Sequence, residues 1–493
     1  MTGRFMRKSK VLVVGIDGAT WSLIEPWADE GRLPTFGKLL RNGAWGELRS
    51  SIPYMTYPAW KCYSTGKNPG KLGVYWFLSL DFKNRRIVTH SSLSFKADEF
   101  WDYLGRQGFK VGIINMPTTY PPKKINGFMI SGFGASNESK YTIPPSLKRE
   151  LEEKFNYKVN PSRWIKYQST DALEDLEELI SSRFRVAQRF IAEVDFMHLT
   201  IFFIDNIQHY FWNDKRILLR FYQKIDKNLG RLIQSADIVF LMSDHGFTAL
   251  KDVFYINVWL EEEGYLVRKK SYRDSLSQAG ITFERLASIT DRTKLLPHLY
   301  SKLPDNIRSR IKLTLPADAF DATFNSLGKL LDWENSLVVA LESTIYINRE
   351  KINGKMEYER LRSRLIRQLS AVKNPSTNEK VFKRIFRKEE IYSGDHLDVA
   401  PDLVVIPADG YEVKLSLYGE KAMWESELKK GGETRKRYGV HSMKGIFLAF
   451  GDRIKRGIRI EGASIYDLAP TVLHIYNVPI PEDLDGRVLT EIF

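Results

Sequence analysis

The sequence contains a single cysteine, Cys62, so no disulfide can form within the chain of 493 residues. Disulfides are typical of oxidising compartments, and a lone cysteine favours a cytoplasmic location. Long hydrophobic runs are also missing, since no apolar stretch approaches the roughly 20 residues that cross a bilayer. The apolar run Val11 to Ile16, which follows a basic N-terminal stretch, is too short for the core of a secretory signal. We therefore predict a cytoplasmic protein without a transmembrane segment.

Nucleic-acid-binding motifs are missing as well, because the sequence has neither zinc-finger spacing nor an RNA-recognition signature. The chain nevertheless carries 74 lysine and arginine residues against 60 acidic ones, a formal net charge of +14. A positive surface attracts phosphorylated small molecules, nucleic acids and anionic membranes alike. We expect a small phosphorylated substrate as the partner and keep nucleic acid as an alternative that no motif supports. The sequence does not indicate an oligomeric state.

Helical and strand patterns alternate along most of the chain. The continuous apolar run Val11 to Ile16 is typical of a strand that is covered on both faces. This alternation predicts an α/β fold, doubly wound, with a mostly parallel central sheet and helices on both faces. The other predicted elements are helices at 21–42, 100–107, 173–194, 221–235 and from about 464, and strands at 110–115, 198–204, 238–242 and 445–450.

One segment departs from this alternation. Between Gly264 and Leu331 strand signals disappear, short helical patterns take over, and 12 basic residues stand against 6 acidic ones. We predict that residues 264–331 form a basic helical insertion or cap, and that residues 1–263 and 332–493 form the catalytic core.

Acidic and histidine residues gather where predicted strands end, which is where open α/β sheets bind their ligands. In the stretch from Asp205 to His209, a helix would place these two residues one turn apart on the same face. Each stretch also has an ordinary explanation when taken singly; Asp17-Gly18, for example, is a common turn. With no cysteine among them, the residues suit Zn²⁺ or Mn²⁺. The set comprises Asp17, Asp205, His209, Asp244, His245 and His441.

Thr56 lies at the predicted start of a short helix. Proline, here Pro58, is favoured at a first helical position, and glycine, here Gly66, just past the helix end. The amide groups and the dipole at a helix start favour a bound phosphate or a developing alkoxide. An ordinary N-terminal cap has the same pattern, so the helix start alone does not assign a role to Thr56.

In this order, the motifs resemble those of the alkaline phosphatase superfamily. The similarity is greatest to its branch of type I phosphodiesterases, nucleotide pyrophosphatases and predicted phosphohydrolases or phosphomutases. Outside residues 264–331 it covers most of the chain, and it implies an alkaline phosphatase-like fold. The segments that carry it are 13–21, 56–73, Asp205 with His209, 243–246, His441, 466–471 and 485–487.

The resemblance implies a site for two divalent metal ions, with Zn²⁺ expected and Mn²⁺ as the alternative. The implied ligands are Asp205, His209 and His441 for one ion, and Asp17, Asp244 and His245 with Thr56 for the other. Thr56 would attack phosphorus in a phosphodiester, phosphoanhydride or phosphomonoester and form a phosphothreonine intermediate. Water would release the phosphoryl group in a hydrolase, whereas a substrate hydroxyl would accept it in a phosphomutase.

Some positions depart from the pattern of the relatives and leave the substrate open. Leu72 stands where relatives commonly carry histidine, and no asparagine lies near Trp76, where many nucleotide pyrophosphatases have one that contacts phosphate. Lys67 and Lys71 would neutralise phosphate charge in its place, although both could equally be solvated loop lysines. A catalytically silent polyanion-binding protein is a further alternative, but such a protein has no physical need for six aligned ligand side chains.

Overall fold

The apolar run Val11–Ile16 forms strand β1, and all six of its residues are buried in the computed structural model. The structure describes residues 9–162, 170–269, 328, 330–415, 422–428 and 437–493. β1 pairs in parallel with β8 (Phe196–Ile201) on one side and with β9 (Ile238–Met242) on the other. Since neighbouring parallel strands end at the same edge of a sheet, the residues that follow these three strands lie close together.

These strands belong to a nine-stranded sheet of order β19-β2-β18-β9-β1-β8-β5-β6-β7. The strands β9, β1, β8, β5 and β6 are mutually parallel, whereas β18 and β7 run antiparallel to their neighbours. The predicted mostly parallel sheet is therefore confirmed. The bounds of its other strands are β2 Ala44–Arg49, β5 Val111–Met116, β6 Gly127–Ser131, β7 Thr142–Ile143, β18 Lys444–Gly451 and β19 Ile458–Ile460.

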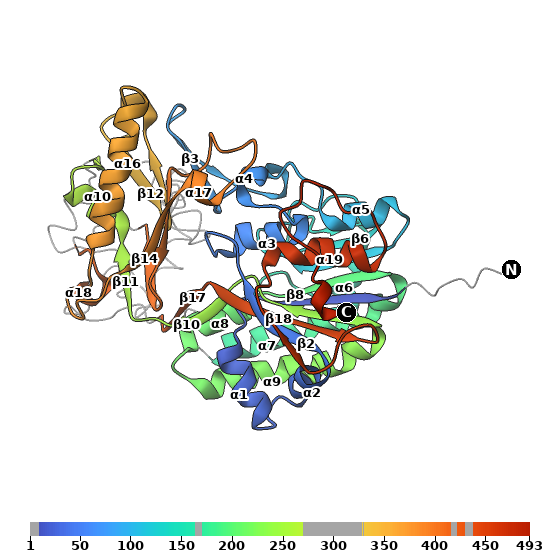
Figure 1. The fold of residues 1–493 in the computed structure, drawn as a ribbon. Helices are drawn as coiled ribbons and strands as arrows, with labels where there is room; N and C mark the ends of the chain where they lie inside the picture. The colour runs from blue at the N-terminus through green and yellow to red at the C-terminus, as the bar shows by residue number, and fades with distance from the viewer. Residues whose placement is uncertain (1–8, 163–169, 270–327, 329, 416–421, 429–436) are drawn as a thin grey trace, which may run out of the picture.

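Helices cover both faces of this sheet, as predicted (Figure 1). Alternate residues of β1 point to opposite faces, so Leu12 joins the hydrophobic core on one face and Val13 the core on the other. One face carries α1 (Trp21–Asp29), α2 (Pro34–Asn42), α7 (Thr170–Phe190) and α9 (Lys215–Leu232), and the other carries α3 (Thr56–Thr65), α5 (Phe100–Arg106) and α19 (Leu468–Ile475).

A second, smaller lobe has a sheet and a hydrophobic core of its own (Figure 1). Its four antiparallel strands have the order β12-β13-β15-β14, and α10 (Ile256–Glu262) and α16 (Gly354–Ala371) contribute to its core. The sequence patterns did not indicate this sheet, because its strands are short. Their bounds are β12 Val338–Leu341, β13 Thr344–Ile347, β14 Phe382–Arg387 and β15 Leu403–Pro407.

Shorter elements link the two lobes and extend them. They are the paired strands β3 (Leu78–Asp81) with β4 (Arg86–Thr89), β10 (Gly246–Ala249) with β17 (Gly439–Ser442) and β11 (Asp252–Tyr255) with β16 (Tyr411–Lys414), and the helices α4 (Pro69–Leu72), α6 (Leu147–Phe155), α8 (Ile204–Phe211), α17 (Lys388–Ile391) and α18 (Glu425–Leu428).

Most of the predicted insertion, residues 270–327 and 329, lies outside the described residues, so its helical character stays a prediction. Its two ends belong to the small lobe, because Tyr265, Leu266 and Leu331 are buried in that lobe's core. The backbone N–H of Lys269 donates to the carbonyl of Leu330, so the ends of the segment lie side by side.

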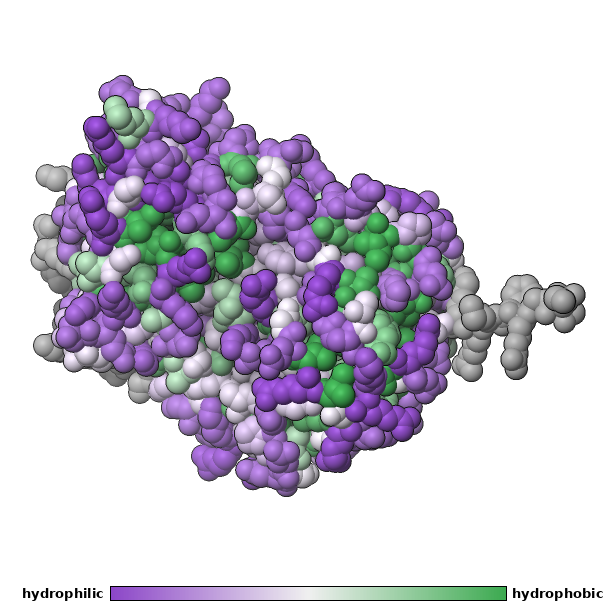
Figure 2. Space-filling model, viewed as in Figure 1, coloured by the Kyte–Doolittle hydropathy of each residue, from purple (hydrophilic) through white to green (hydrophobic). Residues whose placement is uncertain are grey.

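The outward surface of the small lobe around α16 is mostly hydrophilic in the view of Figure 2. Across the described part of the chain, we find no helix with the length and apolar character that a membrane span requires.

Candidate metal centre and nucleophile

Acidic and histidine residues converge at the edge of the large sheet where β1, β8 and β9 end. Asp17 directly follows β1, and Asp244 and His245 follow β9 within two and three residues. After β8 the chain turns and begins α8, which carries Asp205 and His209 on one face. The last member, His441, comes from β17, which pairs with β10 just after His245. The structure thus brings all six predicted ligand residues to one place.

Asp205, His209 and His441 form the first cluster. The Nε2 atom of His441 lies 2.9 Å from Asp205 Oδ1 and 3.1 Å from His209 Nε2. The Nε2 atom of His209 lies 3.5 Å from the same carboxylate oxygen. Three ligand atoms at such separations can surround one cation.

Asp17, Asp244 and His245 form the second cluster. The Nε2 atom of His245 lies 3.3 Å from Asp244 Oδ2 and 3.6 Å from Asp17 Oδ1. The hydroxyl oxygen of Thr56 lies 3.4 Å from the same nitrogen. The predicted nucleophile therefore borders this cluster.

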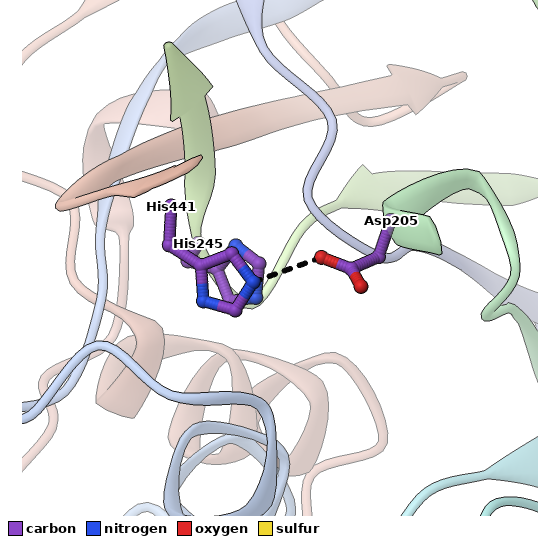
Figure 3. Close-up of side chains that lie close together, drawn as sticks. All are labelled: Asp205, His245 and His441. Atoms are coloured by element: carbon purple, nitrogen blue, oxygen red, sulfur yellow. Dashed lines mark hydrogen bonds and ion pairs between the residues drawn. The ribbon is translucent and has the colours of Figure 1, made fainter. Parts of the chain in front are cut away.

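His245 stands between the two clusters. Its ring stacks on that of His441, with centroids 3.7 Å apart, and both rings face Asp205 (Figure 3). Ligand atoms of Asp205, His245 and His441 all lie within 4.8 Å of one another, as do those of Asp17, Asp244 and His245. The sequence motifs did not indicate that His245 also lies close to the first cluster.

The burial of these groups favours a cation between them. Asp17, Asp244 and His245 are fully buried, and burial raises the pKa of Asp17, to which the negative charges of Asp244 and Asp205 add. Burial likewise raises the pKa of Asp244 to about 7 and lowers the pKa of His245. Asp17 Oδ1 and Asp244 Oδ2 are buried without a hydrogen-bond partner among the described residues. Orphaned carboxylate oxygens beside imidazole nitrogens fit Zn²⁺ or Mn²⁺.

Backbone contacts orient the ligand side chains. Nδ1 of His209 lies 2.8 Å from the carbonyl oxygen of Gly439, and Nδ1 of His245 lies 3.1 Å from that of Gly246. A proton on Nδ1 in these contacts leaves Nε2 free to bind a metal. The backbone N–H of Gly18 donates to Asp244 Oδ1 at 3.2 Å, which leaves Oδ2 of that carboxylate free.

Thr56 is the first residue of α3, and it is 6% exposed. The preceding Met55 provides no side-chain cap, and helix geometry leaves the N–H groups of Thr56 and Tyr57 without an intrahelical acceptor. Gly66 ends the helix in a left-handed conformation with φ 67°, as predicted. Pro58 is the third helical residue rather than the first, because the helix already begins at Thr56.

Lys67 and Lys71 lie at the other end of α3 from Thr56. The helix α3 has 10 residues, which corresponds to about 15 Å, and Lys67 follows it after Gly66. Lys67 forms an ion pair with Asp483, and Nζ of Lys71 lies 2.7 Å from Asp485 Oδ1. Carboxylates of the C-terminal segment thus already pair with both lysines, and the prediction that the two lysines neutralise substrate phosphate stays a prediction.

The model of the family described as type I phosphodiesterase / nucleotide pyrophosphatase matches residues 11–443. Among curated proteins, none matches this chain by sequence.

Solved structures with a similar fold include two hydrolases. Murine ectonucleotide pyrophosphatase / phosphodiesterase 5 in complex with AMP superimposes with a TM-score of 0.54 at 14% identity, covering 96% of each chain. Phosphonoacetate hydrolase from Sinorhizobium meliloti in complex with phosphonoacetate superimposes with a TM-score of 0.57 at 12% identity, also covering 96% of each chain. At such low identity the likeness shows the fold.

Proposed function

The chain belongs to the family of type I phosphodiesterases and nucleotide pyrophosphatases, and on this premise we propose that it is a metal-dependent phosphohydrolase with Thr56 as its nucleophile. The observation that carries this proposal is the position of the Thr56 hydroxyl. It lies at the start of α3, 3.4 Å from Nε2 of His245, and borders the two clusters of aspartate and histidine side chains. The substrate is a small molecule with a phosphodiester, phosphoanhydride or phosphomonoester bond.

In the proposed reaction, the Thr56 oxygen attacks phosphorus while the bond from phosphorus to the leaving oxygen breaks. The N–H groups of Thr56 and Tyr57 at the start of α3 donate to phosphoryl oxygens and favour the negative charge there. Water then breaks the bond between phosphorus and the Thr56 oxygen and regenerates the hydroxyl.

The residues that would hold two divalent cations, Zn²⁺ or Mn²⁺, are the two clusters described above together with Thr56. Bound cations would lower the pKa of the Thr56 hydroxyl and offset charge on the phosphoryl oxygens. The protein side chains fix the positions of the ligand atoms, and the buried surroundings exclude water that would otherwise screen these charges.

The substrate class and the location are further parts of the proposal. AMP and phosphonoacetate, the ligands in the two similar structures, both carry an anionic tetrahedral phosphorus group. We propose that the substrate of this chain carries such a group, and we do not propose AMP or phosphonoacetate itself as the substrate. A cytoplasmic location is supported by the lone cysteine Cys62, which is buried and free.

The nucleophile is tested by replacing Thr56. Thr56→Ala should lower turnover by about 10³-fold or more and hardly change the metal content, because the attacking oxygen is lost while the six Asp and His ligands remain. Thr56→Ser should retain measurable turnover. Rapid quenching of the wild type with a phosphoester should trap a phosphorylated peptide that contains Thr56.

Thr65→Ala is the matched control, because Thr65 lies at the opposite end of α3, where its hydroxyl donates to the carbonyl of Lys61 at 2.8 Å. It should leave turnover close to that of the wild type. Wild-type turnover by Thr56→Ala would place the nucleophile elsewhere and overturn the mechanism.

The metal site is tested by His209→Ala and Asp244→Asn. Each variant should lose bound metal, measured by elemental analysis, together with hydrolysis of p-nitrophenyl phosphate or bis-p-nitrophenyl phosphate. Release of free phosphate, or of a phosphomonoester from a diester, identifies a hydrolase, whereas transfer of the phosphoryl group to a substrate hydroxyl identifies a phosphomutase. Full activity of both variants in chelator contradicts a metal-dependent reaction.

A further inference from the structure

Trp60 lies on the same face of α3 as Thr56, because residues four positions apart are neighbours on a helix. Its side chain is fully buried, and its indole Nε1–H donates to Oδ2 of Asp17 at 2.9 Å. One helix face therefore presents both the hydroxyl that attacks phosphorus and a group that holds a carboxylate of the metal centre.

The hydrogen bond divides the two oxygens of Asp17 between different tasks. Oδ2 is occupied by the indole, while Oδ1 has no hydrogen-bond partner among the described residues and lies 3.6 Å from His245 Nε2. A carboxylate held in this way offers one oxygen to a cation. Among the described residues, the indole of Trp60 is its only side-chain N–H donor, so rotation of the carboxylate would break this hydrogen bond.

Tight packing holds the indole itself in place. A Cβ atom added to Gly15 would lie only 2.3 Å from Cη2 of Trp60, so the glycine leaves the space that the ring fills. The ring edge also meets His198, with centroids 5.7 Å apart, and Tyr63, with centroids 5.9 Å apart. These two neighbours are joined by a contact of 2.9 Å between the Tyr63 hydroxyl and His198 Nδ1.

His198 is in turn fixed to the sheet. Its Nε2 atom lies 2.7 Å from the hydroxyl of Thr200 on the same strand, β8. The contacts therefore run from β8 through His198 and Tyr63 to the ring of Trp60, and from there to Asp17 at the end of β1. Nothing in the sequence motifs singled out Trp60 or His198 for this arrangement.

We propose that Trp60 is a positioning residue, which sets the orientation of Asp17 for a divalent cation and fixes its distance from Thr56. Because the indole and the Thr56 hydroxyl lie on the same face of α3, the hydrogen bond ties the position of the Asp17 carboxylate to that of the nucleophile. This inference rests on the proposed metal-dependent function, and its test has metal affinity as the main readout.

The test replaces Trp60 by phenylalanine, which keeps an aromatic ring but removes the N–H donor. Zn²⁺ titrated in competition with a chromogenic chelator should bind Trp60→Phe about 10–100-fold more weakly than the wild type, the usual effect of removing a group that orients a metal ligand. At limiting Zn²⁺, kcat should fall in parallel, and excess Zn²⁺ should restore much of it.

Trp101→Phe is the matched control. Trp101 is also fully buried, but its indole nitrogen has no hydrogen-bond partner among the described residues. This variant should bind Zn²⁺ as the wild type does. A purely structural role of Trp60 would lower Tm in Trp60→Phe without changing metal affinity, and that result would overturn the inference.

The remaining outcomes are also decisive. If the wild type binds neither Zn²⁺ nor Mn²⁺, the proposed function fails; if the wild type and Trp60→Phe bind the metal equally, only the inference fails. Should Trp60→Phe not fold, a crystal structure of the wild type with Zn²⁺ decides. Asp17 bound to the ion through Oδ1, with Oδ2 on the indole, supports the inference, whereas a carboxylate that binds through both oxygens or has left the indole refutes it.

Discussion

Replacing Asp485 by alanine tests how the C-terminal segment holds the end of α3 that lies away from Thr56. The Asp485 carboxylate accepts hydrogen bonds from the backbone N–H of Asn68 at 2.7 Å, from its side-chain amide at 2.9 Å, and from Lys71 Nζ at 2.7 Å. The side chains of Asp485 and Lys71 are each 25% exposed, so water screens these contacts only in part.

The expected magnitude follows from these three contacts. Each of the three hydrogen bonds contributes about 1 kcal/mol of net stabilisation, so Asp485→Ala should lower the free energy of unfolding by about 3 kcal/mol. Asp483→Ala is the control, because Asp483 makes an ion pair with Lys67 but is 59% exposed. An exposed pair of this kind contributes about 1 kcal/mol or less.

Urea unfolding at neutral pH, followed by circular dichroism and by tryptophan fluorescence, measures both effects. The two signals are compared because a chain with two lobes need not unfold in a single step. Equal stability of Asp485→Ala and Asp483→Ala would refute the assignment of a structural role to this carboxylate. KM of folded Lys71→Ala should equal that of the wild type; a rise in KM would instead support phosphate binding by the lysine.

Two further predictions concern other parts of the molecule. Burial raises the pKa of Glu99, but the positive charges of Lys61 and Lys123 have the larger combined effect and lower the pKa below its usual value. The wild type should therefore lose stability as the pH falls below about 4.3 towards that lowered pKa. In thermal unfolding, the difference in Tm between pH 7 and pH 4 should be smaller for Glu99→Gln than for the wild type. An equal difference would contradict this prediction. Joining residue 269 to residue 328 by a short linker should leave a folded, metal-binding protein with altered substrate preference, since the two ends lie side by side. Deleting all of residues 264–331 should lower Tm more than this shorter deletion, because it also removes buried residues of the small lobe. Equal Tm values of the two deletion variants would contradict this prediction.

Local patterns in the sequence predicted the residue types of the site and five of the nine strands of the large sheet, but not β2, β6, β7 or β19. The apolar run of β1 indicated a strand covered on both faces, and the structure confirms it. Asp205 and His209 were expected one turn apart on a helix, and α8 places them there. Some observed helix ends differ from the predicted ones because a capping residue sets the end. The helix α9, for example, begins at Lys215 rather than at residue 221, because the Asp214 side chain accepts hydrogen bonds from its first turn.

The small lobe and the partners of single side chains were beyond the reach of such patterns. Its strands are four to six residues long and come together across the chain, so no run in the sequence marks the sheet. Lys71, in the short helix α4, forms a hydrogen bond with a carboxylate 414 positions away, and nothing in the local sequence indicates such a partner.

The sequence by itself determined which residues follow the central strands and that a short helix begins near Thr56, because hydrophobic periodicity and helix-end preferences act over a few neighbouring residues. Only the tertiary structure decided that His245 stands between the two clusters, that Trp60 holds Asp17, and that Lys67 and Lys71 are paired away from the site. These relations join residues as far as 416 positions apart, and packing sets them through the whole fold rather than through any local stretch of chain.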